Sequence, residues 1–222
     1  WQLTFVRTQG CRSADIEGYC SDTSVRAGGR IGLFLSAQPA TEVSVDVYRL
    51  GWYGGKGGRH IAKLGPFKVS PQPVPPVGEN RLRECRWERT AEIEIPADWV
   101  SGVYVGKLSC TAHRYESYVI FVVRDDRTAD LLFQTSDTTW QAYNPWGGRS
   151  LYENFGDGSR FDRSKVVSFD RPYALAYSWG SADFLTHELP LIALIEELGI
   201  DTAYATDIDL HTSGLGENDE LD

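Results

Sequence analysis

The first half of the chain, from residue 16 to about 124, contains short strand-like runs separated by turn residues and no convincing helical period. Apolar and polar residues alternate around Val43, Val45 and Val47. A period of two places one face of a strand on a core and the other toward water. This half is therefore expected to be all-β, and several short strands at this spacing indicate an immunoglobulin-like or related sandwich.

The last run of this half, Tyr118–Val123, is apolar at almost every position, which predicts a strand covered on both sides or lying at a domain junction. The charged stretch Arg124–Arg127 follows, and beyond it strand-like runs alternate with helical ones. A length of 222 residues fits two domains of roughly 100 residues each. We therefore expect a β-sandwich domain at 1–125 and an α/β domain at 126–222.

The second half predicts a buried strand at 131–133, further strands at 165–169 and 202–206, and a short helix near Trp140 with Ser136 or Asp137 as its cap. The clearest helix has one apolar face, followed by Gly199 at its end; the face consists of Leu185, Leu189, Ile192, Ile195 and Leu198. The expected topology is βαβ-like. Because about three strands are few for a sheet with its own core, the α/β domain is expected to be incomplete at its C-terminus.

The composition excludes several classes of function. A net charge of −9 and the lack of a Lys/Arg run make a nucleic-acid partner unexpected. No apolar run approaches the ~20 residues that cross a bilayer, so we expect no membrane segment. The chain begins at Trp1 without an initiator Met or a signal peptide, which predicts a processed or trimmed chain.

Four cysteines allow three complete disulfide pairings and contain no paired C-x-x-C motif for structural zinc. The pairing to test joins Cys11 to Cys20 across a short loop and Cys85 to Cys110 between strands. Such bonds would indicate an oxidising compartment, secreted or periplasmic. The alternative is four reduced, partly buried thiols in a cytoplasmic protein.

The segment Thr138–Gly148 is dense in aromatic and amide side chains and follows directly after an expected strand. Tyr143 could bind a hard metal as a phenolate, and Gln141 and Asn144 could orient an amide substrate. The alternative is that the aromatic residues of this segment pack beneath the sandwich with their polar tips satisfied.

Three other parts of the sequence contain residues that indicate a functional site more weakly. Ser168–Tyr173 ends an expected strand and sets an acid, a base and a phenol side by side, although Asp170 and Arg171 could form an exposed ion pair of little consequence. Asp207 and Asp209 lie just past the last strand as potential metal ligands or ordinary loop acids. The stretch Tyr48–Gly55 predicts packing of Trp52 at the sandwich rim, with carbohydrate or inter-domain contact as the alternative.

Five segments together resemble the family of the large (beta) subunit of N,N-dimethylformamidase. They occur in the family's order, namely Ile16–Tyr19, Tyr48–Gly55, Ala97–Tyr104, Trp140–Gly148 and Ser168–Tyr173. The resemblance covers most of residues 16 to 211. It implies a β-rich domain joined to a domain similar to class I glutamine amidotransferases, and hydrolysis of a formamide to formate and dimethylamine.

The resemblance also implies a mononuclear iron site held by two tyrosines and a glutamate. The tyrosine of Gln-Ala-Tyr-Asn corresponds to Tyr143, and that of Asp-Arg-Pro-Tyr corresponds to Tyr173. The glutamate belongs to a Gly-His-Asp-Glu-Tyr-Trp-like motif, which does not occur in these 222 residues. The third ligand is therefore expected outside this sequence, and residues 1–222 by themselves are expected to be inactive.

The leading hypothesis is a metal-dependent amidohydrolase that acts on the C–N bond of a small amide. Tyr143 and Tyr173 would be metal ligands, and the residues expected to line the site are Trp140, Gln141, Asn144 and Trp146. Asp170, Asp207 and Asp209 are secondary candidates. A small subunit or a second copy of the chain is a potential partner. The rival hypothesis is a non-catalytic sandwich that binds a glycan or a protein, and a third retains the fold as a binding platform.

Overall fold

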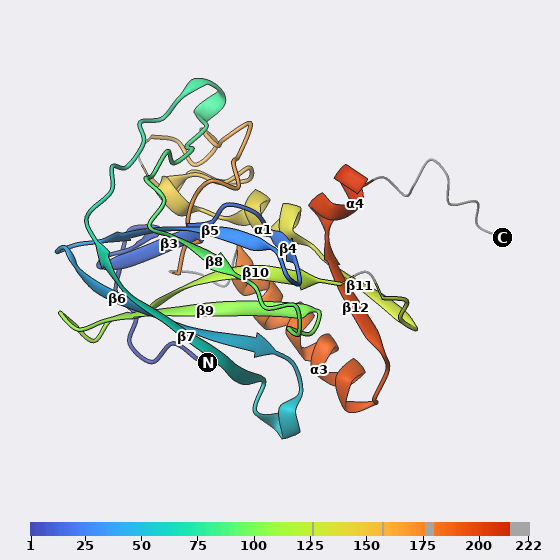
Figure 1. Cartoon of the computed structure of the whole chain (residues 1–222). Helices are drawn as coiled ribbons and strands as arrows, with labels where there is room; N and C mark the ends of the chain where they lie inside the picture. The colour runs from blue at the N-terminus through green and yellow to red at the C-terminus, as the bar shows by residue number, and fades with distance from the viewer. Residues whose placement is uncertain (126, 157, 176–179, 214–222) are drawn as a thin grey trace.

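A computed structural model of the chain describes residues 1–125, 127–156, 158–175 and 180–213. These residues form a mixed α+β fold that consists mostly of β-sheet with few helices (Figure 1). The expected α+β class is confirmed. Most strands precede residue 125 and all α-helices follow it, in line with the change of pattern in the sequence.

Two sheets dominate the part before residue 125. The larger has the order β4-β10-β9-β6-β7, with bounds Ser24–Arg26, Ser117–Arg124, Gly102–Cys110, Thr41–Leu50 and Gly58–Val69. The smaller has the order β3-β5-β8, with bounds Ile16–Cys20, Arg30–Ala37 and Ala91–Glu94. A short antiparallel pair joins β1 (Thr8–Gln9) to β2 (Arg12–Ser13). The other neighbours are also antiparallel, except for β4 and β10, which run parallel.

The two sheets share one hydrophobic core. Val43, Val45 and Val47 of β6 are fully buried in it, as their alternation predicts. Leu33 and Leu35 of β5 contribute from the smaller sheet. Full burial of such an aliphatic side chain stabilises a fold by roughly 1.5–3 kcal/mol. This core therefore provides the main attraction between the sheets.

A second core covers the other face of the large sheet. Strand β10 is buried from Ser117 to Val123, and its Tyr118 and Ile120 pack in a cluster with helical residues. These include Trp140 of α1 (Asp137–Tyr143) and Ile192 of α3 (Leu189–Glu197). The prediction that the continuous apolar run is covered on both sides is therefore confirmed.

The part after residue 125 contains two parallel strands, β11 (Leu131–Thr135) and β12 (Thr202–Thr206), with the helices between them in the chain. This agrees with the βαβ-like expectation. Every residue of β12 is buried, whereas Leu132 of β11 is 55% exposed. The expectation that β11 is buried is therefore wrong, because the side chain of Leu132 on its outer face is exposed.

The predicted strand at 165–169 is also wrong, because no strand forms there. The backbone N–H of Lys165 donates to the Asn80 carbonyl at 2.9 Å, and that of Ser164 donates to the Ser150 carbonyl at 3.0 Å. The segment thus pairs with irregular loops, which a local apolar run such as that around Val166 cannot reveal.

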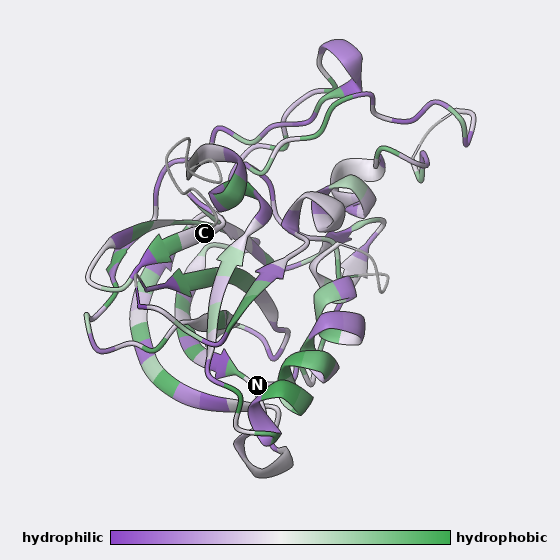
Figure 2. Cartoon of the chain, turned by 90° about the vertical axis from the view of Figure 1, so that its right-hand side faces the viewer, coloured by the Kyte–Doolittle hydropathy of each residue, from purple (hydrophilic) through white to green (hydrophobic). Residues whose placement is uncertain are grey.

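Helical structure runs continuously from α2 (Ser181–Asp183) through a π-helical turn (Phe184–Glu188) into α3. Gly199 ends it with a φ of 73°, as predicted. Leu198 is largely exposed, so its assignment to the buried face is wrong. Figure 2 shows the hydrophobic character of this helix. No helix among the described residues is long and apolar enough to cross a membrane.

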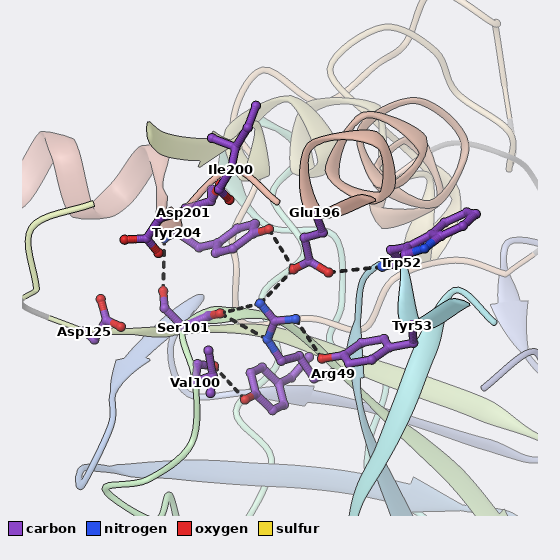
Figure 3. A network of polar contacts seen from close by, with 12 residues as sticks. Arg49, Trp52, Tyr53, Val100, Ser101, Asp125, Glu196, Ile200, Asp201 and Tyr204 are labelled. Carbon is purple, nitrogen blue, oxygen red and sulfur yellow. Dashed lines mark hydrogen bonds and ion pairs between the residues drawn. The ribbon is translucent and has the colours of Figure 1, made fainter. Parts of the chain in front are cut away.

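A polar network joins the large sheet to α3 and β12 (Figure 3). The guanidinium of Arg49 donates to the Ser101 carbonyl through Nε and Nη2, at 3.1 and 2.8 Å, and to the Tyr53 hydroxyl at 2.7 Å. It also forms an ion pair of 2.8 Å with Glu196 of α3. The Tyr204 hydroxyl of β12 donates to the same carboxylate at 3.1 Å. The network therefore connects elements on both sides of residue 125.

The stretch Tyr48–Gly55 contacts α3 instead of forming an isolated rim. The backbone N–H of Trp52 donates to Glu196 Oε2 at 3.1 Å. A Cβ atom at Gly51 would lie 2.0 Å from the same oxygen, so only glycine permits this approach. The Trp52 backbone therefore contacts the part of the chain after residue 125, while its side chain is 36% exposed.

The predicted disulfides are not formed, and all four cysteines are free thiols. Cys11 and Cys85 belong to a third cluster around Trp87 and Trp146. Cys20 and Cys110 pack against the core between the sheets. Each predicted pair thus has its two members in different clusters, because spacing along the chain does not determine which side of a sheet a cysteine meets. Burial raises the pKa of the Cys20 and Cys85 thiols to about 12.

Candidate functional site

The two segments that carry the family resemblance in the second half lie together. Arg171 donates from Nε to the Gln141 side chain at 3.1 Å and from Nη2 to the Gln141 carbonyl at 3.1 Å. Asn144 donates to the Pro172 carbonyl at 3.0 Å and accepts from the Ala174 backbone at 3.0 Å. The segments Trp140–Gly148 and Ser168–Tyr173 are therefore one structural unit.

Arg171 is the centre of this unit and is only 1% exposed. Its other contacts, all to backbone carbonyls, reach Asn144, Trp146 and Arg149 at 3.2, 3.3 and 3.4 Å. Burial lowers the pKa of this guanidinium to about 10. All these acceptors are neutral, so the expectation of an exposed Asp170–Arg171 ion pair is wrong. Asp170 instead accepts at its carbonyl from the Cys85 backbone at 2.7 Å.

Asn144 has no free hydrogen-bonding capacity. Its amide nitrogen donates to Gln141 Oε1 and the Pro172 carbonyl, while its oxygen accepts from the Trp146 and Ala174 backbones. An amide side chain has two donor hydrogens and two acceptor lone pairs, and here all four are used. Asn144 therefore has a structural role in the site and has no hydrogen-bonding group left for a ligand.

Gln141 has one defined orientation. Its Oε1 accepts from Arg171 Nε and Asn144 Nδ2, so its NH₂ group is directed elsewhere. Burial raises the pKa of Tyr173 above the ordinary range. A hydrogen bond from Gln141 lowers that pKa, but its effect is smaller. Gln141 thus presents donors to a phenol that remains protonated at neutral pH.

A small cavity of about 30 Å³ lies at this place, between the β strands and α1. Its polar lining includes Asp137, Gln141, Arg171 and Tyr173, and Trp140 contributes an aromatic wall. Residues of β3 and the following turn, including Thr23, line the opposite side. Of the residues predicted to line a site, the structure brings Trp140, Gln141 and Tyr173 to this one cavity.

Asp137 is a cavity residue that sequence reasoning treated only as a helix cap. It is 1% exposed, and its Oδ1 accepts from the Asp207 backbone at 2.6 Å. Its Oδ2 has no hydrogen-bond partner among the described residues. Burial raises the pKa of this carboxyl to about 7, and the charges of Asp207 and Asp209 add to the effect. Its place directly after a strand was the only signal in the sequence.

The carboxylates of Asp207 and Asp209 accept hydrogen bonds from backbone and side-chain groups of neighbouring elements. Asp207 begins α4 (Asp207–Ser213), and its Oδ2 accepts from the Thr138 backbone at 3.2 Å, at the start of α1. Asp209 accepts from Ser24 at 2.6 Å and from the Thr206 backbone at 2.8 Å, and it forms an ion pair with Arg124. These contacts give both acids structural roles.

The aromatic residues of the first segment are divided among several environments. Trp140 donates to Glu188 at 2.7 Å in the second core, and Trp146 donates to Glu17 at 2.9 Å in the third cluster. Tyr143 is half-buried, stacks on Tyr152 at 4.2 Å, and does not line the cavity. Packing with satisfied polar tips thus describes both tryptophans, whereas Tyr143 lies near the surface.

The described residues do not provide a complete iron site. They contain no group of three or more His, Cys, Asp and Glu side chains that could hold a metal ion. Tyr173 lines the cavity beside Asp137, whereas the Tyr143 hydroxyl is hydrogen-bonded to Tyr152. The two phenols implied by the resemblance are therefore not directed into one cavity by the residues that the structure describes.

Comparison with known proteins places the chain in a family. No curated protein matches the chain. A family model described as "N,N-dimethylformamidase beta subunit-like, C-terminal" matches residues 44–219, which is more than half of the sequence and includes both segments around the cavity. The chain therefore belongs to the N,N-dimethylformamidase beta subunit-like family.

Proposed function

We propose that this chain supplies part of an amide hydrolase that cleaves the C–N bond of small amides similar to N,N-dimethylformamide. The observation that carries the proposal is the cavity of about 30 Å³, which joins Gln141 and Tyr173 from the two segments typical of the family to the neighbouring carboxyl of Asp137. An amide needs donors for its carbonyl oxygen, which Gln141 and Tyr173 can supply. A cavity of about 30 Å³ is too small for a whole dialkylated amide, so the alkyl groups would lie outside it.

The finer architecture belongs to the same proposal. The two sheets before residue 125 would form an immunoglobulin-like sandwich domain at 1–125. The residues at 126–222 would belong to an α/β domain similar to class I glutamine amidotransferases. The parallel pair β11 and β12 with helices between them supports the second assignment, since parallel strands need a crossover connection.

Within such a site the chain's own residues have distinct tasks. Gln141 would donate to an oxygen in the cavity, because Arg171 and Asn144 hold its amide in one orientation. Without a bound metal, Tyr173 would donate its phenolic hydrogen, because burial raises its pKa and keeps it protonated; as an iron ligand it would be a tyrosinate and would not donate. Arg171 would act as a positioning residue that fixes the segment carrying Gln141.

The proposal also includes iron bound by Tyr143 and Tyr173, and this assignment rests on the family resemblance alone. Because the described residues do not form a complete site, no reaction step is derived through the metal. A subunit partner or a second copy of the chain is proposed as well, since the family's description refers to a beta subunit.

Incubation of the protein with a panel of small N-alkylated formamides and acetamides, with and without added iron(II), tests the hydrolase proposal by the release of free amine. We expect Tyr173→Phe to lower the rate by about 100-fold or more, in the range expected for a lost donor to a developing charge. The matched variant Tyr48→Phe, in β6, should retain the rate. Because residues 1–222 by themselves are expected to be inactive, the assay uses the full-length protein. Equal rates for the two variants, or no amine release by the unmodified full-length protein under any condition, would reject the proposal.

A separate measurement addresses the metal. The unmodified protein, Tyr143→Phe and Tyr173→Phe would be loaded with iron, and metal content and visible absorption would be recorded. Iron-bound tyrosinate absorbs in the visible range, so each substitution should weaken the band and lower the iron content. Unchanged content and absorption in both variants would remove the two tyrosines from the metal assignment.

A further inference from the structure

Asp137 differs from the neighbouring acids in the use of its oxygens. Both carboxylate oxygens of Asp207 and both of Asp209 accept hydrogen bonds. Glu188 accepts from Trp140 with one oxygen and from the Ser136 backbone with the other. Asp137 bonds with Oδ1 only, and its Oδ2 is left unpaired in a buried position.

An unpaired buried carboxylate oxygen is costly. A buried polar atom without a partner loses its hydration and gains no hydrogen bond in return, and the loss is larger when the atom is charged. Such an atom in a folded protein calls for an explanation, which can be an ordered water or a ligand. Asp137 lines the cavity, so the missing partner can be supplied from there.

The cavity has the size for a water molecule, and a few polar side chains among its mostly apolar lining can bind one. A volume of about 30 Å³ exceeds the ~10–15 Å³ that one water needs and is too small for a dialkylated amide. A buried water also needs at least two polar partners. Asp137 Oδ2 can accept from such a water, and the polar side chains of Gln141 and Tyr173, which also line the cavity, can supply the second partner.

We propose that Asp137 is a water-positioning residue, whose Oδ2 holds a buried water molecule in the cavity beside Tyr173, and that this is the water consumed in amide hydrolysis. The second half rests on the proposed function. In that reaction the water oxygen forms a bond to the amide carbonyl carbon and the C–N bond breaks. One water proton reaches the departing amine nitrogen, and the products are a carboxylic acid and an amine.

Asp137→Asn separates this role from a purely structural one. The Asn oxygen must accept from the Asp207 backbone, as Oδ1 does now, so the NH₂ group would point into the cavity. The variant keeps the hydrogen bond to α4 but presents a donor where the water needs an acceptor. Asp137→Leu removes both interactions, and Asp15→Asn changes a buried acid that does not line the cavity.

The first arm of the test detects the water directly, by high-resolution crystallography and by NMR cross-relaxation between water and the Tyr173 side chain. The unmodified protein and Asp15→Asn should show a water within hydrogen-bonding distance of Oδ2, about 2.6–3.0 Å. Asp137→Leu should lose it. A dry cavity in the unmodified protein, or a protein group paired with Oδ2, would overturn the proposal.

The second arm measures hydrolysis of N,N-dimethylformamide by the same proteins. Asp137→Asn should lower kcat by about 100-fold with KM changed less than threefold, because a misplaced nucleophile affects the reaction more than substrate binding. An unchanged kcat in a variant that has lost the water would overturn the catalytic half. No hydrolysis by the unmodified full-length protein, with the water present, would reject the proposed function and leave the water site established.

Discussion

At the scale of single residues, Arg171 shows how a buried charge can organise a loop without an ionic partner among the residues that the structure describes. Its guanidinium bonds to the carbonyls of Gln141, Asn144, Trp146 and Arg149. Arg171→Met would leave these carbonyls unsatisfied, each at a cost of about 1–3 kcal/mol. We expect the free energy of unfolding, measured in urea, to fall by roughly 3 kcal/mol or more.

A matched substitution at an exposed site provides the control for Arg171. Arg30 forms ion pairs with Glu92 and Glu94 on the surface of the sheet. Exposed pairs contribute about 0–1 kcal/mol, so Arg30→Met should change the free energy of unfolding by no more than that. Similar losses in the two variants would contradict the central position assigned to Arg171.

The carboxyl of Asp137 predicts a specific dependence of stability on pH. Its pKa in the folded state is raised to about 7 by burial, from 3.8 for the free group. Between these values the folded protein binds a proton that the unfolded chain has released. Stability should therefore decrease as the pH rises from about 4 to 7, by up to about 1.4 kcal/mol per pH unit from this group.

Asp137→Asn tests this dependence because asparagine does not titrate. The difference in free energy of unfolding between the unmodified protein and the variant, measured from pH 4 to 8, should favour the variant increasingly up to about pH 7 and then level off. Parallel curves over the whole range would show that the folded state does not raise the pKa of this carboxyl.

At the scale of elements, the contact between β6 and α3 depends on a glycine. A Cβ at Gly51 would lie 2.0 Å from Glu196 Oε2, so Gly51→Ala must displace the carboxylate that bonds to Trp52 and Arg49. We expect a loss of about 1–3 kcal/mol in the free energy of unfolding. Glu196→Gln, which keeps the shape, should lose less.

The control for Gly51 is Gly78→Ala. A Cβ at Gly78 would meet only the Leu82 carbonyl oxygen, at 3.4 Å, and its φ of −86° suits any residue. Its free energy of unfolding should change by less than about 0.5 kcal/mol. An equal effect at both glycines would mean that backbone freedom, and not the approach of Glu196, explains the requirement at Gly51.

At the scale of the whole molecule, the second core joins the large sheet to the helices, so the two parts should unfold together. Ile192 is 1% exposed in this core, and Ile192→Ala should lower the free energy of unfolding by about 2–5 kcal/mol. Leu191→Ala on the outer side of the same helix should cost less than about 1 kcal/mol.

The cooperativity itself is measured by following circular dichroism and tryptophan fluorescence in the same denaturation. A single transition is expected with both probes for the unmodified protein and for Ile192→Ala, because both cores share strand β10. Two separate transitions would show that the sheets and the helical part are stabilised independently of the contacts with Ile192.

Local patterns were sufficient for part of the fold. The alternation at Val43, Val45 and Val47 identified the inward face of β6, and the run Tyr118–Val123 identified a strand buried on both faces. Gly199 marked the end of a helix. Each of these is determined by residues close in the chain, where the period of apolar side chains reflects the geometry of the backbone. The two family segments were likewise recognisable by their residues alone.

The tertiary structure alone decided which side chains meet. Gln141 and Arg171 are 30 positions apart, and Asp137 and Asp207 are 70 apart. No periodicity reports such pairs, so the neutral partners of Arg171 and the unpaired oxygen of Asp137 could not be inferred from the sequence. The sequence by itself determined where several strands and helices form, although not at 165–169, whereas burial and hydrogen-bond pairing depend on contacts between distant segments. The hydrogen bonds and pKa shifts of the candidate site therefore depend on those contacts.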